Sequence, residues 1–177
     1  FPPPRNNFVL NIGSCNNLHY RNTIQFYKKT IDLCRSLGVK NYGIHSGFLI
    51  DIKSSELGNK IKKRKLYPRN QSIERLAQGY KALTKYSKNK VALYLENNVI
   101  TKNNLEEYKE NPLLFTSFSD YLNLKKRFNF KILLDIAHLK VSAKTLGNDF
   151  IKEVKKFKKY VNYVHISGNN SLQDQNN

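Results

Sequence analysis

The stretch VALYLE at residues 91–96 is an apolar run of strand length that ends in a glutamate. The stretch FKILLD at residues 130–135 has the same design and ends in an aspartate. Runs this apolar are typical of strands in a parallel sheet whose outer face is covered. Shorter runs at residues 8–12, 42–45 and 163–166 raise the number of expected strands to five.

Amphipathic segments separate these strands. Their apolar residues recur at three- and four-residue steps, which is typical of helices. The expected helices cover residues 20–37, 72–87, 119–127 and 149–159, with Ser119 as the N-cap of the third. Strict alternation of strand and helix predicts an α/β fold with parallel strands and crossover helices, in a single domain over residues 1–177.

The chain is strongly basic, with 31 Lys and Arg against 13 Asp and Glu and a formal net charge of +18 over 177 residues. Clustered cations can neutralise nucleic-acid phosphates, and the densest cluster lies at residues 62–65. Aromatic side chains that would stack on bases are not interleaved with it, apart from Tyr67. We therefore favour solvated lysines over a nucleic-acid groove, and a nucleic-acid partner is not expected.

The sequence also bears on location. No uncharged apolar run reaches the ~18 residues needed to span a membrane, and the first residues do not resemble a signal peptide. Cys15 and Cys34 show no CxxC spacing, which indicates a reducing compartment and no cysteine metal site. The expected location is the cytoplasm, without a membrane partner.

Titratable side chains stand at the ends of four expected strands. These are His45, Glu96, Asp135 and His165, and His138 follows shortly after one of them. Because the carboxyl ends of parallel strands lie on one face of the sheet, the five side chains are expected to converge. A mixed set of histidines and carboxylates suits a divalent Mn, Zn, Co or Mg ion.

Each of these residues also has a purely structural explanation. Asp135 can cap a helix, Glu96 can cap the turn that follows it, and His45 can be a hydrogen-bonded loop residue. His138 can be a satisfied core histidine, whereas His165 alternates with two apolar neighbours and needs a polar partner on the opposite face. The joint occurrence of all five favours a shared site.

The longest connections cover residues 46–70 and 97–116. Long connections in compact domains usually serve function. Residues 48–69 contain the basic cluster and are expected to close over an anionic substrate. By contrast, His19 precedes an expected helix, away from any strand end, and is expected at the surface.

Four motifs carry a resemblance that covers nearly the whole chain. They are HSG at residues 45–47, LEN at 95–97, LDIAH at 134–138 and VHIS at 164–167. In this order they resemble the xylose isomerase-like TIM-barrel superfamily, which holds sugar and sugar-phosphate isomerases and epimerases together with endonuclease IV-type nucleases. Further matches, to a group of sugar phosphate isomerases/epimerases, are FPPP at 1–4, FVLN at 8–11, GFLID at 47–51, ENNV at 96–99 and HLKVSA at 138–143.

The resemblance implies roles for individual residues. Glu96, Asp135 and His165 match the metal ligands of the isomerases, with Glu96 also an acid or base. His45 matches a metal ligand of the nucleases. His138 matches a substrate-contacting histidine of the isomerases, or a ligand to a second metal in the nucleases. Further substrate contacts are expected from Asn98, Lys140 and Asp174.

The resemblance also implies an incomplete barrel, with about five of the eight βα units, the third to the seventh strand. The family's early histidine and final glutamate fall outside this sequence. The implied function is a metal-dependent isomerase or epimerase of a sugar or sugar phosphate, acting by proton transfer through a metal-stabilised enediolate. Two alternatives stay open: an endonuclease IV-like phosphodiesterase, which Asp174-Gln175-Asn176 in place of an Asp-x-His motif disfavours, and a truncated barrel without activity. The sugar, the metal and the oligomeric state, a homo-oligomer included, also stay open.

Overall fold

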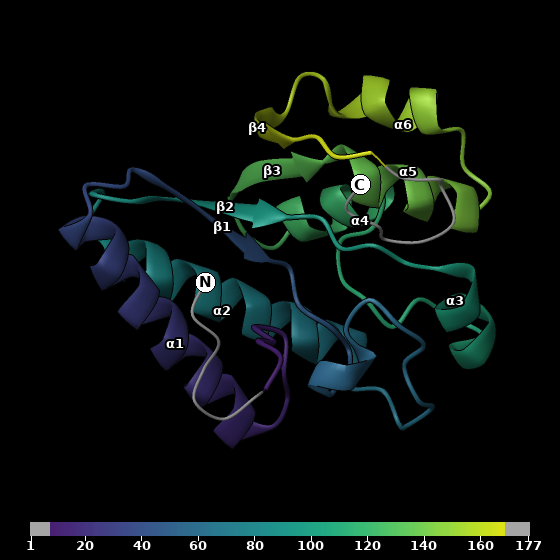
Figure 1. Cartoon of the computed structure of the whole chain (residues 1–177), viewed down its shortest axis with the longest axis horizontal. Coiled ribbons are helices and arrows are strands. Elements are labelled where there is room, and N and C mark those ends of the chain that lie inside the picture. Colours follow the sequence, from purple (N-terminus) through teal and green to yellow (C-terminus); the bar gives the residue numbers. More distant parts are fainter. Residues whose placement is uncertain (1–7, 169–177) are drawn as a thin grey trace.

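The computed structural model describes residues 8–168. Within this range the sheet has four parallel strands whose spatial order follows the chain (Figure 1). The strands are β1 (Asn41–His45), β2 (Ala92–Glu96), β3 (Lys131–Asp135) and β4 (Val161–His165). The helices are α1 (Asn17–Ser36), α2 (Arg69–Ser87), α3 (Lys102–Tyr108), α4 (Phe118–Lys125), α5 (Ile136–Thr145) and α6 (Phe150–Phe157), with a 3-10 turn η1 (Ser54–Glu56) after β1. The expected α/β fold is confirmed.

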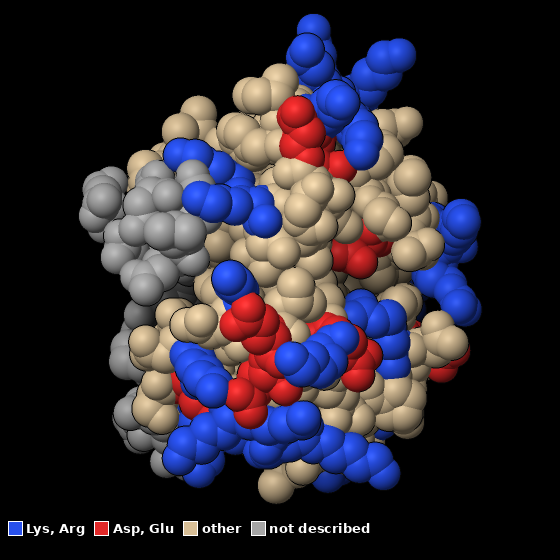
Figure 2. All heavy atoms as spheres, turned by 90° about the vertical axis from the view of Figure 1, so that its right-hand side faces the viewer, with Lys and Arg blue, Asp and Glu red and all other residues tan. Residues whose placement is uncertain are grey.

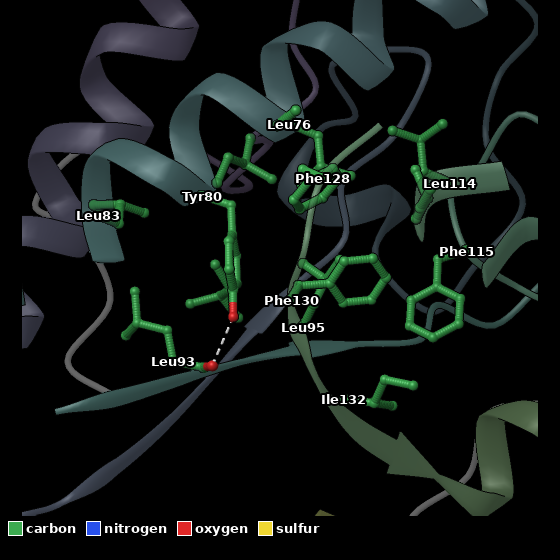
Figure 3. Packing of buried hydrophobic residues seen from close by; sticks show 14 of the residues in the cluster. Leu76, Tyr80, Leu83, Leu93, Leu95, Leu114, Phe115, Phe128, Phe130 and Ile132 are labelled. Carbon is green, nitrogen blue, oxygen red and sulfur yellow. Dashed lines mark hydrogen bonds between the residues drawn. The ribbon is translucent and has the colours of Figure 1, made fainter. Parts of the chain in front are cut away.

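An apolar core joins the helices to one face of the sheet. Alternate strand residues such as Ile44, Leu95 and Ile132 are buried in it, because successive side chains of a strand point to opposite faces. Tyr80 reaches from α2 into this core, and its hydroxyl donates a 2.8 Å hydrogen bond to the carbonyl oxygen of Leu93 (Figure 3). The tyrosine therefore ties α2 to β2 without leaving a buried polar group unpaired.

The opposite face of the sheet carries the candidate site. His45, Glu96 and Asp135 fall on this face, because the residues before them in the strands are buried in the helix-covered core. β4 lies at the end of the sheet next to β3, and its residues from Asn162 to His165 are exposed. The candidate site therefore lies on the face of the sheet opposite the buried strand residues of the core.

The strand expected at residues 8–12 is wrong. This segment is irregular and joins no strand of the described sheet. Its backbone is held by side chains instead, since the amide of Asn11 donates to Thr23 Oγ1 at 3.2 Å. The Asn11 side chain donates in turn to the carbonyl oxygens of Phe48 (3.1 Å) and Ile50 (3.2 Å). Gly47 lets the segment approach, because a Cβ there would lie 2.8 Å from the Gly13 nitrogen.

The helices also differ from expectation. The N-cap of α4 is Ser117, whose hydroxyl accepts from the Asp120 amide at 3.2 Å, so the assignment of Ser119 is wrong. Helices α3 and α5 were not expected, because α3 is short and the run of apolar residues in β3 continues directly into α5. None of the described helices is both long and apolar enough to cross a membrane.

Candidate metal centre

The carboxyl ends of the strands bring the candidate ligands to one edge of the sheet. In the parallel register His45 lies beside Glu96, and Asp135 lies beside His165. Glu96, Asp135 and His165 each offer a ligand atom, and these atoms lie within 4.8 Å of one another. Such a set of two carboxylates and an imidazole is suited to a divalent ion such as Mn²⁺, Zn²⁺, Co²⁺ or Mg²⁺.

Two negative side chains converge on one histidine in this cluster. The Nδ1 atom of His165 lies 2.7 Å from Asp135 Oδ2 and 3.9 Å from Glu96 Oε1. The Asp135 side chain is 3% exposed, whereas that of His165 is 57% exposed. Two carboxylates brought together at the edge of a core repel each other unless a positive charge compensates them. The donor set and its charge therefore fit a bound divalent cation.

Asp135 is both a helix cap and a member of the cluster. Its Oδ1 atom accepts a 2.8 Å hydrogen bond from the His138 amide, which caps α5. Its Oδ2 atom is the one that faces His165. The two explanations of this residue drawn from the sequence are thus compatible, because each uses a different oxygen.

Asn97 positions the cluster and was not singled out from the sequence. It is fully buried directly after β2. Its side chain accepts from the Asp135 amide at 2.7 Å and donates to the Asp135 carbonyl oxygen at 3.0 Å. These two bonds fix the end of β2 against the end of β3. A buried amide following an apolar strand is the signal that would have identified it, because such a group requires partners.

His45 faces the Glu96 oxygen that His165 does not face, and His138 lies near His45. His45 Nδ1 is 3.9 Å from Glu96 Oε2, and the rings of His45 and His138 are 6.2 Å apart. His138 Nδ1 lies 2.8 Å from the carbonyl oxygen of Asn97, so this nitrogen must carry the proton and donate. In the neutral ring the acceptor nitrogen is then Nε2.

The four strand-end side chains and His138 all line a cavity of about 830 Å³. Other parts of its wall come from the connection after β1, including Phe48, Ile52, Glu56, Leu57 and Ile61. In Figure 1 this connection and α3 lie beyond the points of the strand arrows. The structure thus brings the five side chains to one cavity, and their roles stay a prediction.

The remaining expected substrate contacts have different surroundings. Asn98 lines the cavity but is buried, and its amide nitrogen donates to Ser46 Oγ (2.9 Å) and to the carbonyl oxygens of Gly47 (2.7 Å) and Leu114 (2.8 Å). Lys140 is half-buried on α5 and is not among the residues that line the cavity. Asp174 lies outside the described residues.

His19 is only partly exposed, so it is more buried than the expected surface position. Its side chain is 17% exposed, and its Nε2 atom lies 2.8 Å from the carbonyl oxygen of Val9 and 3.7 Å from Asp51 Oδ1. Asp51 also accepts hydrogen bonds from Ser14 (2.9 Å) and Tyr67 (2.7 Å). Burial, together with the bond to Asp51, raises the pKa of Tyr67 to about 12. This polar network holds the connection after β1 onto the N-terminal segment.

Comparison with known proteins shows which fold family this architecture resembles. The family model described as "Xylose isomerase-like TIM barrel" matches residues 2–177. A D-tagatose 3-epimerase-like protein superimposes with a TM-score of 0.67 at 16% identity, over 98% of this chain and 57% of that structure. The D-psicose 3-epimerase of Clostridium cellulolyticum H10, solved with D-tagatose, gives 0.59 at 16% identity, over 89% and 48%. An L-ribulose 3-epimerase gives 0.60 at 17% identity, over 89% and 46%.

These comparisons establish the fold and show how much of the matched structures the chain covers. The chain spans about half the length of the solved structures it matches. No curated protein sequence matches it. Identities this low establish a shared fold, and the family model adds that the match runs along nearly the whole sequence. The chain belongs to the xylose isomerase-like TIM-barrel family.

Proposed function

We propose that this chain carries the metal site of a metal-dependent isomerase or epimerase that acts on a sugar or sugar phosphate. The convergence of Glu96, Asp135 and His165 at the carboxyl ends of three adjacent strands carries the proposal. The sugar epimerases among the matched structures support the choice of substrate class. A divalent ion held by these three side chains would polarise a substrate carbonyl as a Lewis acid.

In this proposal Glu96 moves the proton on the carbon next to the carbonyl. One of its oxygens faces His165 and the other faces His45, so the carboxylate lies between the metal cluster and the rest of the cavity. A general base must lie within hydrogen-bond reach of the proton that it removes, and this position allows it. His138 orients a substrate oxygen through Nε2, because its Nδ1 is held by the protein backbone.

Metal binding tests the site directly. We expect the purified chain to bind Mn²⁺ in a calorimetric titration, and Glu96→Gln and His165→Ala each to weaken that binding on the order of 10–100-fold. The matched control is Glu74→Gln, which makes the same change at an exposed position of α2. Undiminished Mn²⁺ affinity in both cluster variants would show that the site is not there.

Proton exchange tests the chemistry. With Mn²⁺ in D₂O, we expect deuterium to enter a ketose such as D-tagatose at the carbon beside the carbonyl, and Glu96→Gln to abolish the exchange. Deuterium exchange requires only one catalytic base, so it can be measured without a completed epimerisation. Mn²⁺ binding without exchange of any sugar tested would favour a barrel without activity, and cleavage of an abasic-site duplex would favour a phosphodiesterase.

A further inference from the structure

The connections that lead into the four strands are strongly basic. In a parallel sheet they lie together at the edge where the strands start, and the strand arrows of Figure 1 point away from that edge. They cover residues 37–40, 88–91, 126–130 and 158–160, and none of them contains Asp or Glu. Their exposed cations, here called the basic edge, are Lys40, Lys88, Lys90, Lys126, Arg127, Lys158 and Lys159.

The cations of the basic edge lie close together and are not neutralised. Neighbouring strands are ~4.8 Å apart, so the four strand starts span roughly 15 Å. Among the described residues, no carboxylate forms an ion pair with a side chain of the basic edge. Asp32, near the end of α1, binds Arg35 (2.8 Å) and Tyr86 (2.7 Å) instead. The positive potentials of these side chains therefore add up, because adjacent charges lie within a Debye length of ~10 Å.

The side of the molecule where the strands end has a mixed charge. Figure 2 looks onto this side and shows Asp and Glu residues between the Lys and Arg residues. Arg64 lies 2.7 Å from Glu56, and Lys60 lies 2.6 Å from Glu107. Cations on this side are thus partly compensated, whereas those of the basic edge are not.

Helix stability accounts for only part of the basic edge. Lys88, Lys126 and Lys158 are the C-caps of α2, α4 and α6, where a cation interacts favourably with the helix dipole. Lys40 and Lys90 lie two or more residues beyond a C-cap, where this effect has fallen off.

Exposed apolar side chains lie in the same connections. Leu37 is 69% exposed, Val39 is 41% exposed and Tyr160 is 44% exposed. Nucleic-acid phosphates offer no favourable contact to aliphatic side chains such as Leu37 and Val39. The surface of an anionic bilayer suits both kinds of group, because its headgroups attract Lys and Arg and its interfacial layer accepts apolar side chains.

We infer that the basic edge binds the surface of an anionic lipid bilayer. The inference is independent of the proposed function, because the candidate metal centre lies at the other ends of the strands. Each described strand has five residues, which separates the two edges by roughly 16 Å. Binding of this kind needs no segment that crosses the membrane, and such segments were the only ones considered in the expectation of no membrane partner.

Vesicle sedimentation tests the role of the cations. At about 100 mM salt, we expect the chain to bind vesicles of phosphatidylcholine with about 30% phosphatidylserine, and pure phosphatidylcholine vesicles at least about 10-fold more weakly. A cation near an anionic surface strengthens binding about 5-fold, so the double variants Lys88→Gln/Lys90→Gln and Lys158→Gln/Lys159→Gln should each weaken it more than about 10-fold.

The matched control is Lys62→Gln/Lys63→Gln. It removes two exposed cations from the connection after β1, on the other side of the molecule, and should weaken vesicle binding less than about 2-fold. Leu37→Ser tests the apolar contribution and should weaken vesicle binding more than about 3-fold. Leu57→Ser, at an exposed position after β1, should leave vesicle binding unchanged.

Equal binding to both kinds of vesicle would overturn the inference. An equal loss in the control double variant would overturn it as well, because net charge and not the basic edge would then drive binding. Tighter binding of duplex DNA than of phosphatidylserine vesicles at the same salt, unaffected by Leu37→Ser, would assign the basic edge to nucleic acid instead. Since the two edges are separate, each of these outcomes leaves Mn²⁺ binding and proton exchange as tests of the proposed function alone.

Discussion

Each polar atom of Asp135 has a partner. Its amide and carbonyl bind Asn97, its Oδ1 caps α5, and its Oδ2 faces His165. The helix-capping role needs only an oxygen acceptor, whereas the metal role needs the charge. A substitution that keeps the oxygen acceptor and removes the negative charge of Asp135 therefore separates the capping role from the proposed metal role.

We expect Asp135→Asn to fold with a loss of stability of about 1 kcal/mol or less, because asparagine is also a good N-cap. The same variant should weaken Mn²⁺ binding on the order of 10–100-fold. Urea unfolding and a calorimetric Mn²⁺ titration measure the two effects. Asp135→Ala is the comparison, because it should lose both the cap and the metal. An asparagine variant with wild-type metal affinity would contradict the assignment of Oδ2.

Glu56 shows how one buried residue makes the connection after β1 sensitive to acid. It is 5% exposed, and its bonds to Arg64 lower the pKa of its carboxyl from 4.5 to about 2. A carboxyl with a lowered pKa in the folded state stabilises the fold above its unfolded pKa, and this contribution disappears as the pH falls through the folded pKa.

Glu56→Gln should therefore change the acid response of the chain. At neutral pH we expect the wild type to have the higher unfolding temperature, and the difference between the two proteins should shrink as the pH falls from about 5 toward 2. Thermal unfolding followed by circular dichroism at several pH values measures it. A difference that stays constant over this range would mean that the ion pair does not stabilise the connection.

At the scale of elements, the connection after β1 is held by the polar network around Asp51. Tyr67, near the end of the connection, donates to Asp51 Oδ2 at 2.7 Å. Another tyrosine makes a matching bond at the surface, since Tyr86 donates to Asp32 Oδ2 at 2.7 Å. The two bonds share their chemistry and differ in burial, so they form a natural comparison.

We expect Tyr67→Phe to lower the free energy of unfolding by about 1–3 kcal/mol, because it removes a partly buried hydrogen bond to a charged acceptor. Tyr86→Phe should cost less than about 0.5 kcal/mol, because water replaces the exposed bond. Urea denaturation of both variants measures the difference. Equal losses would show that the Asp51 network does not anchor the connection.

The strands and helices that could be predicted from the sequence are those whose positions follow from the pattern of apolar residues. The apolar runs of β2 and β3 and the periodic faces of α1 and α2 were confirmed to within a few residues. The segment at residues 8–12 has the same apolar character, yet the side chains of Asn11 and Thr23 take the backbone bonds that a strand would use. Long-range side-chain bonds of this kind leave no periodic pattern in the sequence. The helix α3 is too short to show one.

The residues of the candidate site were easier to predict from the sequence than the residues that position them. His45, Glu96, Asp135 and His165 follow from strand ends in parallel register, which is a property of topology. Asn97 acts through a side-chain bond to another strand, and the engagement of Arg64 with Glu56 depends on how a long connection folds. The amide that directly follows the apolar run of β2 is a local hint of Asn97, whereas no local pattern encodes the pairing of Arg64 with Glu56.

At the scale of the whole molecule, the net charge is +18, and none of the described Lys and Arg residues lines the cavity. We expect random-sequence duplex DNA to bind weakly at 50 mM salt and to lose affinity by more than about 10-fold at 200 mM, because such binding depends on counterion release. Mn²⁺-dependent binding of D-tagatose should persist across that range, since the sugar is uncharged. Fluorescence anisotropy and calorimetry measure the two. Salt-resistant DNA binding would indicate a built nucleic-acid site.

The Asn97 side chain has a consequence for how this molecule can change over generations. Its amide continues the pairing of β2 and β3 one step past Glu96, as a backbone peptide would. These two hydrogen bonds therefore hold the strand ends that carry Glu96 and Asp135 in fixed positions relative to each other. Substitutions in the long connections can then be accommodated without moving Glu96 and Asp135, the proposed metal ligands.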